Sequence, residues 1–191
     1  MLTLEQLRAV CLTAPTGRLA VYAEPLNSAM QEFAIHDGLR AAHFLPQLLH
    51  ESAEFRYTQE LASGLAYEGR LDLGNDQPGD GRKYKGHGPM QITGKKNHFL
   101  CADALGIPRS DIVDYLCTPE GGCRGAGWFW QIGAGLNLSN RAHAHGIPDG
   151  VDLNSLADRD DVESITIAVN GGLNGYAERQ KYLARAKKVL Q

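Results

Sequence analysis

Two glutamates in one stretch of the chain have the spacing to act as an acid and a base. A continuous helical register places Glu51 on an apolar stripe with Phe44, Leu48 and Phe55. Apolar surroundings favour the protonated form of a carboxylic acid, which can then donate its proton. Glu60 follows nine residues later, on the opposite side of a straight helix. Both acids can therefore face one cleft only if the helix ends near Phe55 and the chain turns back.

A protonated carboxyl group and an ionised one together suit the hydrolysis of a glycosidic bond. Spacing alone does not select Glu60 as the second acid, because several other acids are available. These are Glu54, Glu68, Asp72, Asp76 and Asp80.

Other chemistries lack a central residue in this chain. His50 and Glu51 begin like a zinc-peptidase motif, but Glu54 stands where the second histidine is needed. The segment Gly94–Lys96 lacks the serine or threonine that completes a phosphate-binding loop. A serine-hydrolase elbow is also absent. We expect neither a metal nor an organic cofactor.

One arginine lies on the apolar stripe of the last expected helix. Arg179 falls between Tyr176 and Leu183, and a guanidinium in such a place needs an anionic partner. Two interpretations stay open: an ion pair with any nearby carboxylate, or a pair with a catalytic glutamate or the loop that carries one. The other bases of this helix are Lys181, Arg185, Lys187 and Lys188. Such a cationic face is either solvated or attracted to anionic cell-wall or membrane polymers.

Composition indicates one soluble globular domain. The chain has 191 residues, of which 43% are apolar and 21% charged, and its net charge of −3 gives no general attraction to nucleic acid. No apolar run approaches the roughly 18 residues of a membrane-spanning helix. The N-terminus lacks the basic start and apolar core of a secretory signal, so we expect synthesis in the cytosol without a signal peptide.

Four cysteines lack the spacing of a zinc site: Cys11, Cys101, Cys117 and Cys123. We expect structural thiols in a reducing compartment. Cys117 and Cys123 could also close a disulfide if the protein later meets an oxidising space.

Caps, prolines and glycines predict a mainly α-helical domain. The expected helices are a short first helix capped by Thr3 and Gln6, two pieces within residues 17–34 separated near Pro25, residues 39–55 with a kink or fresh start near Phe44 caused by Pro46, residues 93–105 capped by Thr93, then residues 110–116, 119–133, 160–169 and 176–190.

A turn is expected at residues 36–38. Residues 63–88 are rich in glycine and predict a long loop with room for one short β-hairpin. We expect residues 1–191 to form a single catalytic domain, with residues 1–25 as a helical extension packed on it and no separate wall-binding domain.

Several motifs resemble one known family. Residues 84–93 read Tyr-Lys-Gly-His-Gly-Pro-Met-Gln-Ile-Thr, which resembles the Tyr-x-Gly-Arg-Gly-Pro-x-Gln-Leu/Ile-Ser/Thr segment of the glycoside hydrolase family 19 chitinases and their phage endolysin relatives. His50–Ser52 resembles the catalytic-acid motif of that family, and Asn170–Leu173 its Asn-Gly-Gly motif. The stretch Tyr67–Gly81 is similar to the endolysin branch more than to plant chitinases. The resemblance spans roughly residues 26–190, with the motifs in the same order.

The resemblance implies a lysozyme-like α-helical fold and a role for each matching residue. Glu51 would be the general acid, Glu60 the general base, and Thr93 would help to hold the attacking water. The remaining site residues would bind sugar or brace the cleft: Gln91, Asn97, Tyr84, Asn170, Arg179 and His50. The family inverts configuration, which implies carboxyl groups about 6.5–9.5 Å apart.

The chain departs from the family pattern at three places. His87 replaces the usual arginine, Pro46 interrupts the helix of the acid, and Ala53 and Glu54 replace glycines that are common after the acid motif. Contacts near Glu51 could therefore differ from those of chitinases.

The combined interpretation is a phage or prophage endolysin that cuts the glycan strand of bacterial peptidoglycan. We expect a monomer without a nucleic-acid partner, released from the host cytoplasm through a holin-type pore to act in the periplasm. The alternatives are a chitinase, a lytic transglycosylase that uses one carboxylate, and a non-catalytic glycan-binding protein.

Overall fold

Helices joined by loops make up the described part of the chain, which in this computed structural model comprises residues 1–35, 38–136 and 138–191. The turn expected at residues 36–38 lies mostly outside these ranges, since His36 and Asp37 are not described. The elements are α1 (Leu4–Val10), α2 (Thr16–Glu32), α3 (Gly38–Glu51), η1 (Leu65–Tyr67), η2 (Leu71–Leu73), α4 (Asp80–Lys83), α5 (Lys95–Leu105), α6 (Ile112–Leu116), α7 (Pro119–Trp128), η3 (Phe129–Gly133), α8 (Ala134–Leu136), α9 (Asn140–Ala144), α10 (Leu153–Ala157), α11 (Val162–Asn170) and α12 (Tyr176–Leu190). The prediction of a mainly α-helical, lysozyme-like fold is confirmed.

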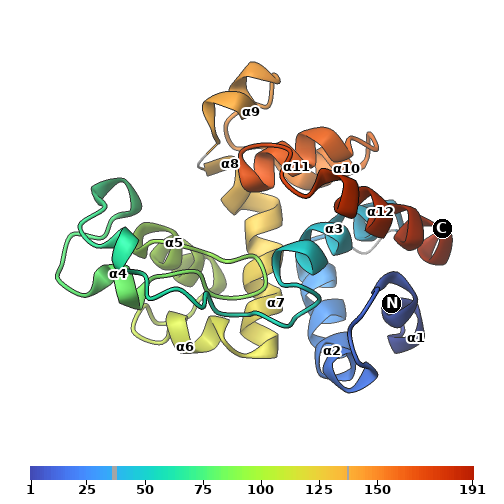
Figure 1. The fold of residues 1–191 in the computed structure, drawn as a ribbon, viewed down its shortest axis with the longest axis horizontal. Helices are drawn as coiled ribbons and strands as arrows, with labels where there is room; N and C mark the ends of the chain where they lie inside the picture. The colour runs from blue at the N-terminus through green and yellow to red at the C-terminus, as the bar shows by residue number, and fades with distance from the viewer. Residues whose placement is uncertain (36–37, 137) are drawn as a thin grey trace.

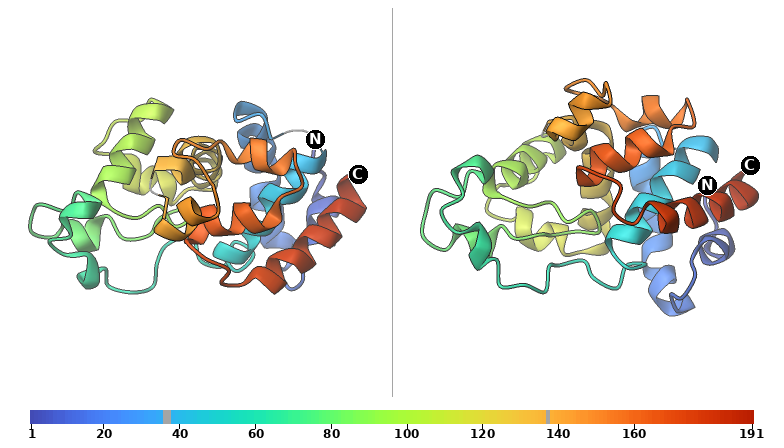
Figure 2. Two further views of the ribbon diagram at one scale, coloured as in Figure 1. Left: turned by 90° about the horizontal axis from the view of Figure 1, so that it is seen from above. Right: turned by 45° about the horizontal axis from the view of Figure 1, so that its top comes forward.

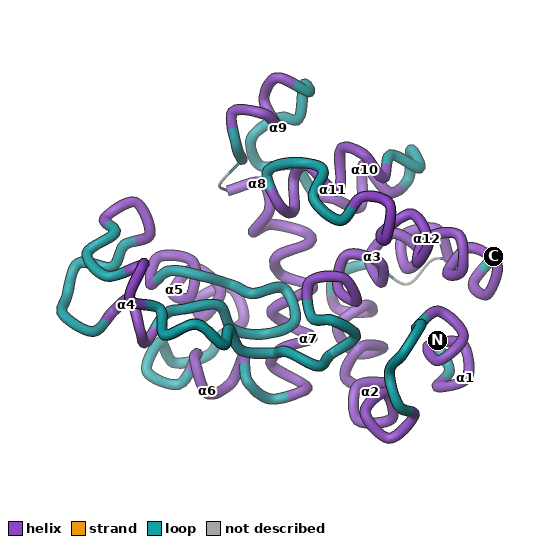
Figure 3. The backbone as a smooth tube through the Cα atoms, in the orientation of Figure 1, coloured by secondary structure: helices purple, strands orange, loops and turns teal. Residues whose placement is uncertain are grey.

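Helix α7 runs through the middle of the molecule and separates two groups of helices (Figure 1). Helices α4, α5 and α6 lie on one side, and α1, α2 and α12 lie on the other, where α2 packs along α7 and α12 along α3. The two groups stay apart in both turned views (Figure 2). The long loops gather beside α4 (Figure 3). Among the described helices, none is long and apolar enough to span a bilayer.

Glycines let α7 sit close to its neighbours. A Cβ atom on Gly127 would lie 2.2 Å from the Phe33 ring, and one on Gly121 would lie 2.0 Å from the carbonyl oxygen of Tyr115. Both distances are far below van der Waals contact, so only glycine allows this close packing. The packing is retained although glycine has a weak helical propensity. Thr118 caps its start by accepting a hydrogen bond from Gly121 N at 3.0 Å.

The helix break predicted near Pro25 and the fresh start offered as one outcome of Pro46 are both absent. Helix α2 is continuous through Pro25, and α3 is continuous through Pro46 with no fresh start near Phe44. An internal proline costs about 3 kcal/mol through a lost hydrogen bond and a backbone clash. Burial along the helix outweighs that loss, because Leu26 and Leu48 are among many side chains of these two helices that solvent does not reach.

Three further predictions of local structure can be compared with the fold: a capping box, the start of one helix and a β-hairpin. The capping box is confirmed, since Thr3 N donates to Gln6 Oε1 at 2.9 Å and Gln6 N donates to Thr3 Oγ1 at 3.1 Å. Helix α11 begins at Val162 with Asp161 as its cap. The β-hairpin is wrong: the described part of residues 63–88 holds η1, η2 and α4, and β-pairing is limited to isolated bridges at His87.

The last helix uses much of its positive charge within the fold. Arg185 donates to the carbonyl oxygens of Ala9, Val10 and Cys11, at distances of 2.8–3.0 Å. Lys187 pairs with Asp160 at 2.5 Å. These contacts tie α12 to the end of α1 and to the turn before α11, so two of the four bases of the predicted cationic face make contacts within the fold.

All four cysteines are free thiols, and only Cys117 among them is exposed. Burial raises the pKa of the Cys101 thiol to about 12, which makes that thiol unreactive at neutral pH.

Candidate active site

Glu51 is the last residue of α3 and lies against a buried arginine. Arg179 Nη2 donates to Glu51 Oε1 at 2.5 Å, and a second guanidinium nitrogen of Arg179 donates to Gln47 Oε1. The Arg179 side chain is 1% exposed and that of Glu51 is 23% exposed. The apolar stripe of Phe44 and Leu48 is buried as expected. The expectation that Glu51 itself has apolar surroundings is wrong, because its carboxylate contacts the buried guanidinium of Arg179. Of the two interpretations of Arg179, the structure supports the pair with the candidate acid.

His50 joins the two helices that hold this ion pair. Its Nδ1 lies 2.6 Å from Glu178 Oε2 on α12. Its ring packs against Gly175, where a Cβ atom would lie 2.1 Å from His50 Cε1 and where φ is +69°. Only glycine meets both conditions, so this contact fixes the start of α12 beside the end of α3.

The chain turns immediately after Glu51. Ser52 Oγ donates to Leu48 O at 2.7 Å and accepts from Phe55 N at 2.8 Å, which ends the helix. Ala53, Glu54 and Phe55 follow with φ of +46°, +57° and +61°. The predicted turn is present, but the expected helix end at Phe55 is wrong, because the helix stops four residues earlier.

Glu60 is held by the segment that follows the glycine-rich loop. Its Oε1 accepts from the Tyr67 hydroxyl at 3.2 Å, and its Oε2 accepts from Gly86 N at 3.0 Å. Its own amide donates to Gly86 O at 2.8 Å. Burial, followed by the nearby Glu60 charge, raises the pKa of the Tyr67 phenol. The candidate base is therefore fixed to Gly86, in the segment that also carries Tyr84, Gln91 and Thr93.

Three of the predicted site residues form a hydrogen-bonded series. The backbone of Gln91 has φ of +52°, and its side-chain Nε2 donates to Gly88 O at 2.9 Å. Thr93 Oγ1 donates to Gln91 O at 2.9 Å, and Asn97 Nδ2 donates to Thr93 O at 2.9 Å. The prediction that Thr93 caps α5 is wrong. Gly94 holds the cap position, and the Thr93 hydroxyl donates to Gln91 O instead.

Two adjoining pockets gather these residues. Gln91, Thr93 and Asn97 line a pocket of about 160 Å³ together with Phe129. Asn97 and Phe129 also line a second pocket of about 330 Å³, together with Asn170. The shared lining residues make the two pockets parts of one cleft, which runs from residues 91–97 to the end of α11.

Asn170, at the end of α11, is held by the turn that follows it, and Tyr84 is packed away from the two pockets. Asn170 Nδ2 donates to Asn174 O at 2.9 Å, and its Oδ1 accepts from Gly172 N at 2.9 Å. Arg179 Nε donates to the same Asn174 oxygen at 3.4 Å, so the Asn-Gly-Gly turn is linked to the partner of Glu51. Tyr84 is buried, and its ring packs against that of His98 with centroids 5.3 Å apart.

A buried histidine pair occupies the place of the usual arginine. His98 Nδ1 donates to Gly94 O at 2.8 Å, which leaves His98 Nε2 to accept from His87 Nδ1 at 3.0 Å. His87 Nε2 then accepts from the Gln59 amide at 3.2 Å. Burial lowers the pKa of His98 to about 4 and also lowers that of His87. The histidine pair therefore carries no positive charge at neutral pH, unlike the arginine that it replaces.

The sequence did not single out Phe129. It begins η3, a five-residue π-helical stretch, and lines both parts of the cleft. Such stretches occur often at functional sites, and a partly buried aromatic ring offers a flat apolar face to a sugar. The sequence analysis predicted one uninterrupted helix over residues 119–133 and therefore missed this π-helical stretch.

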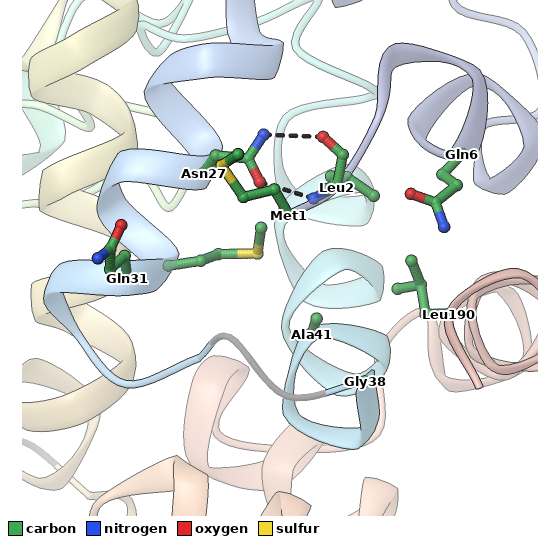
Figure 4. A pocket seen from close by; sticks show the side chains of 9 residues that line it. Met1, Leu2, Gln6, Asn27, Gln31, Gly38, Ala41 and Leu190 are labelled. Atoms are coloured by element: carbon green, nitrogen blue, oxygen red, sulfur yellow. Dashed lines mark hydrogen bonds between the residues drawn. The ribbon is translucent and has the colours of Figure 1, made fainter.

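A larger cavity lies elsewhere. It measures about 480 Å³ and is bounded by α1, α2, α3 and the end of α12, with Leu2, Gln31 and Leu190 in its wall (Figure 4). Asn27 closes one side by hydrogen bonding to the backbone of Leu2. Among the described residues, no acidic or basic side chain lines this cavity. In the described residues, no three His, Cys, Asp or Glu side chains are grouped to hold a metal ion.

The chain is similar to curated proteins over part of their length, although no family model matches it. It is 34% identical over 132 residues to a glycosyl hydrolase family 19 domain-containing protein of Haemophilus influenzae, a match that covers 68% of this chain and 54% of that protein. It is 34% and 33% identical, over 109 and 110 residues, to two endochitinases of Arabidopsis thaliana; these matches cover 54% and 55% of the chain and 38% of each endochitinase. The chain thus spans about half or less of the curated relatives it matches.

Solved structures share the fold. Chitinase C from Streptomyces griseus HUT6037 superposes with a TM-score of 0.73 at 16% identity, over 99% of this chain and 76% of that one. A bacterial family 19 chitinase superposes with a TM-score of 0.69 at 18% identity, over 99% of this chain and 94% of that one.

Proposed function

Because the chain belongs to glycoside hydrolase family 19, whose chitinases share its fold, we propose that it hydrolyses the β-1,4 glycosidic bonds of bacterial peptidoglycan. The observation that carries the proposal is the placement of two carboxylates on separate supports. Glu51 is held by Arg179 at the end of α3, and Glu60 is held by Gly86 beside the residues that line the cleft. Because an inverting glycosidase keeps its acid and its base apart, with room for a water molecule, two carboxylates held by separate supports fit that mechanism.

In this mechanism each carboxylate performs one proton transfer. Glu51 donates its proton to the glycosidic oxygen as the bond to the leaving sugar breaks. The Arg179 guanidinium then stabilises the carboxylate that Glu51 becomes. Glu60 accepts a proton from a water molecule, which attacks the anomeric carbon from the opposite face, so the configuration is inverted. Thr93, whose hydroxyl faces Gln91 O in the free protein, helps to hold that water.

The glycine-rich region supports peptidoglycan as the substrate. Residues 67–81 resemble the endolysin branch of the family, and they form an ordered unit rather than an open loop. Glu68 accepts hydrogen bonds from Gly79 N at 2.5 Å and from Gly81 N at 2.9 Å, and Asn75 Nδ2 donates to Tyr67 O at 2.9 Å. This unit carries Tyr67, which contacts the candidate base Glu60.

Chitin hydrolysis is the second candidate, and the names of the Arabidopsis and Streptomyces relatives favour it. The discriminating experiment compares initial rates on purified sacculi and on chitin oligomers at equal concentrations of N-acetylhexosamine. Peptidoglycan hydrolysis predicts faster release of reducing ends from sacculi. Faster release from chitin oligomers would reassign the substrate.

The carboxylate variants test the mechanism itself. Glu51→Gln and Glu60→Gln should each abolish release of reducing ends from sacculi while keeping the circular dichroism spectrum of the wild type. An active Glu51→Gln variant would refute the acid assignment. Anhydro-muramyl products with an active Glu60→Gln variant would indicate a lytic transglycosylase, and binding to sacculi without any released ends would indicate a glycan-binding protein.

The proposed setting is lysis of a bacterial host. The chain would act as a monomer on the wall, after a holin-type pore has opened the inner membrane. Cells that express the chain should stay intact until chloroform or a pore-forming protein is added, and should then lyse. Lysis without permeabilisation, or a dimer in light scattering, would contradict this setting.

A further inference from the structure

We propose that Glu54 is a positioning residue for the reaction, because its buried carboxylate clamps the N-terminal segment onto the turn that joins Glu51 to Glu60. The inference rests on the proposed roles of Glu51 and Glu60 and adds a requirement to them. Residues 12–14 would then complete the active site from behind, without touching substrate.

The turn needs support because its backbone is strained. Ala53, Glu54 and Phe55 have φ of +46°, +57° and +61°, a region that side chains with a Cβ atom rarely adopt. Glycines are common at the first two of these positions in the family that the sequence resembles, and glycine would adopt such angles freely. This chain has no glycine there, so other contacts must hold the conformation.

The Glu54 carboxylate supplies the largest set of those contacts. Its Oε2 accepts from Thr13 N and from Thr13 Oγ1, both at 2.8 Å, and from Ala14 N at 2.5 Å. Its Oε1 accepts from Leu12 N and from the Tyr182 hydroxyl, the latter at 3.0 Å. Only 2% of Glu54 is exposed. These hydrogen bonds lower the pKa of the Glu54 carboxyl in spite of its burial.

Helix α12 contacts the catalytic stretch at two points. Arg179 and Tyr182 are three residues apart and so lie on one face of the helix. They contact Glu51 and Glu54, which are also three residues apart. The N-terminal segment is fixed to the same helix, because Arg185 donates to the carbonyl oxygen of Cys11 at 2.8 Å. The turn is therefore enclosed between α12 and residues 12–14.

The neighbouring side chain completes the support. The Phe55 ring stacks on Tyr22 of α2, with centroids 4.3 Å apart and planes 14° apart. From this fixed point the chain continues to Glu60. Loss of the Glu54 contacts would leave the strained backbone free to relax, and the distance between the two catalytic carboxylates would no longer be set.

The test compares Glu54→Gln with Glu24→Gln, which changes an exposed glutamate on α2. A glutamine at position 54 turns one acceptor oxygen into an NH₂ group that faces donors. The assay uses soluble peptidoglycan fragments, well below the melting temperature of each variant. We expect kcat of Glu54→Gln to fall at least about tenfold and KM to change less than about threefold. A small misplacement of catalytic groups lowers the rate of the reaction rather than the binding of substrate. Glu24→Gln should match the wild type.

A rescue experiment separates positioning from general stability. Ala53→Gly removes only an exposed methyl group and relieves the strain at one left-handed position. The double variant Ala53→Gly/Glu54→Gln should therefore recover at least about threefold in kcat over Glu54→Gln. If Glu54→Gln does not fold, Tyr182→Phe removes a single donor to Glu54 and should lower kcat about two- to fivefold, with KM unchanged.

Two results would overturn the inference. One is a folded Glu54→Gln variant with the kcat of the wild type; the other, if that variant does not fold, is wild-type kcat in Tyr182→Phe. Failure of the proposed function is distinguishable, because it would appear as activity in Glu51→Gln whatever Glu54→Gln does.

Discussion

Replacing Arg179 by alanine removes the partner of the candidate acid and tests how the ion pair serves stability and catalysis. The guanidinium contacts Glu51, Gln47 and Asn174 O. Breaking a buried ion pair costs about 3–5 kcal/mol, and we expect the lower part of that range because Glu51 is 23% exposed and can be solvated. A loss of about 3–4 kcal/mol corresponds to a fall in melting temperature of roughly 6–16 °C for a chain of this size.

Thermal unfolding by circular dichroism and reducing-end release from sacculi measure the two effects. Arg159→Ala is the control, since Arg159 is exposed and its loss should change stability by less than about 0.5 kcal/mol. We expect kcat of Arg179→Ala to fall about 100-fold, because the Glu51 carboxylate loses the group that stabilises it after proton donation. Arg179→Lys keeps the charge but not the fork, and should recover only part of the loss. A shift in melting temperature no larger than that of Arg159→Ala would refute this reasoning.

Three further predictions concern the scaffold. Gly127→Ala should destabilise the fold by more than about 2 kcal/mol in urea unfolding, because its Cβ would meet the Phe33 ring. Gly17→Ala is the control and should be neutral or stabilising, since the space around Gly17 is open. Equal changes in the free energy of unfolding for the two variants would contradict the packing argument. Gly175→Ala should lower the melting temperature and displace the His50 ring, which NMR of the imidazole protons would report. Burial lowers the pKa of His98 from its usual value of 6.5 to about 4. As the pH falls, the unfolded chain therefore binds a proton at this histidine before the folded chain does, and stability should fall as pH drops from about 6.5 to 4. A His98 resonance that titrates near pH 6.5 would contradict this.

The sequence predicted most helices because caps and apolar periodicity act locally. Thr3 and Gln6 form the expected capping box, and the last helix has the predicted bounds. The errors at Pro25 and Pro46 arise from long-range packing, since burial against other helices outweighs a local preference that the sequence does show.

The candidate site was predictable where a residue type alone sets a requirement, and not where the answer depends on the fold. Arg179 was identified because a buried guanidinium needs an anion, but only the fold shows that the anion is Glu51. The turn after Glu51 was required by geometry, whereas its left-handed backbone could not be predicted, since Ala53 and Phe55 do not favour that conformation. Phe129 was missed because its place in the cleft depends on the π-helical stretch, where the sequence predicted a regular helix.

The anomeric configuration of the first product tests the central claim most directly. Proton NMR of soluble peptidoglycan fragments during the first minutes of digestion should show new reducing ends in the α configuration, because an inverting attack on a β bond produces the α anomer. The same signals should be absent with Glu51→Gln and with Glu60→Gln. New ends in the β configuration, or anhydro-muramyl ends, would contradict the assignment of Glu51 as acid and Glu60 as base.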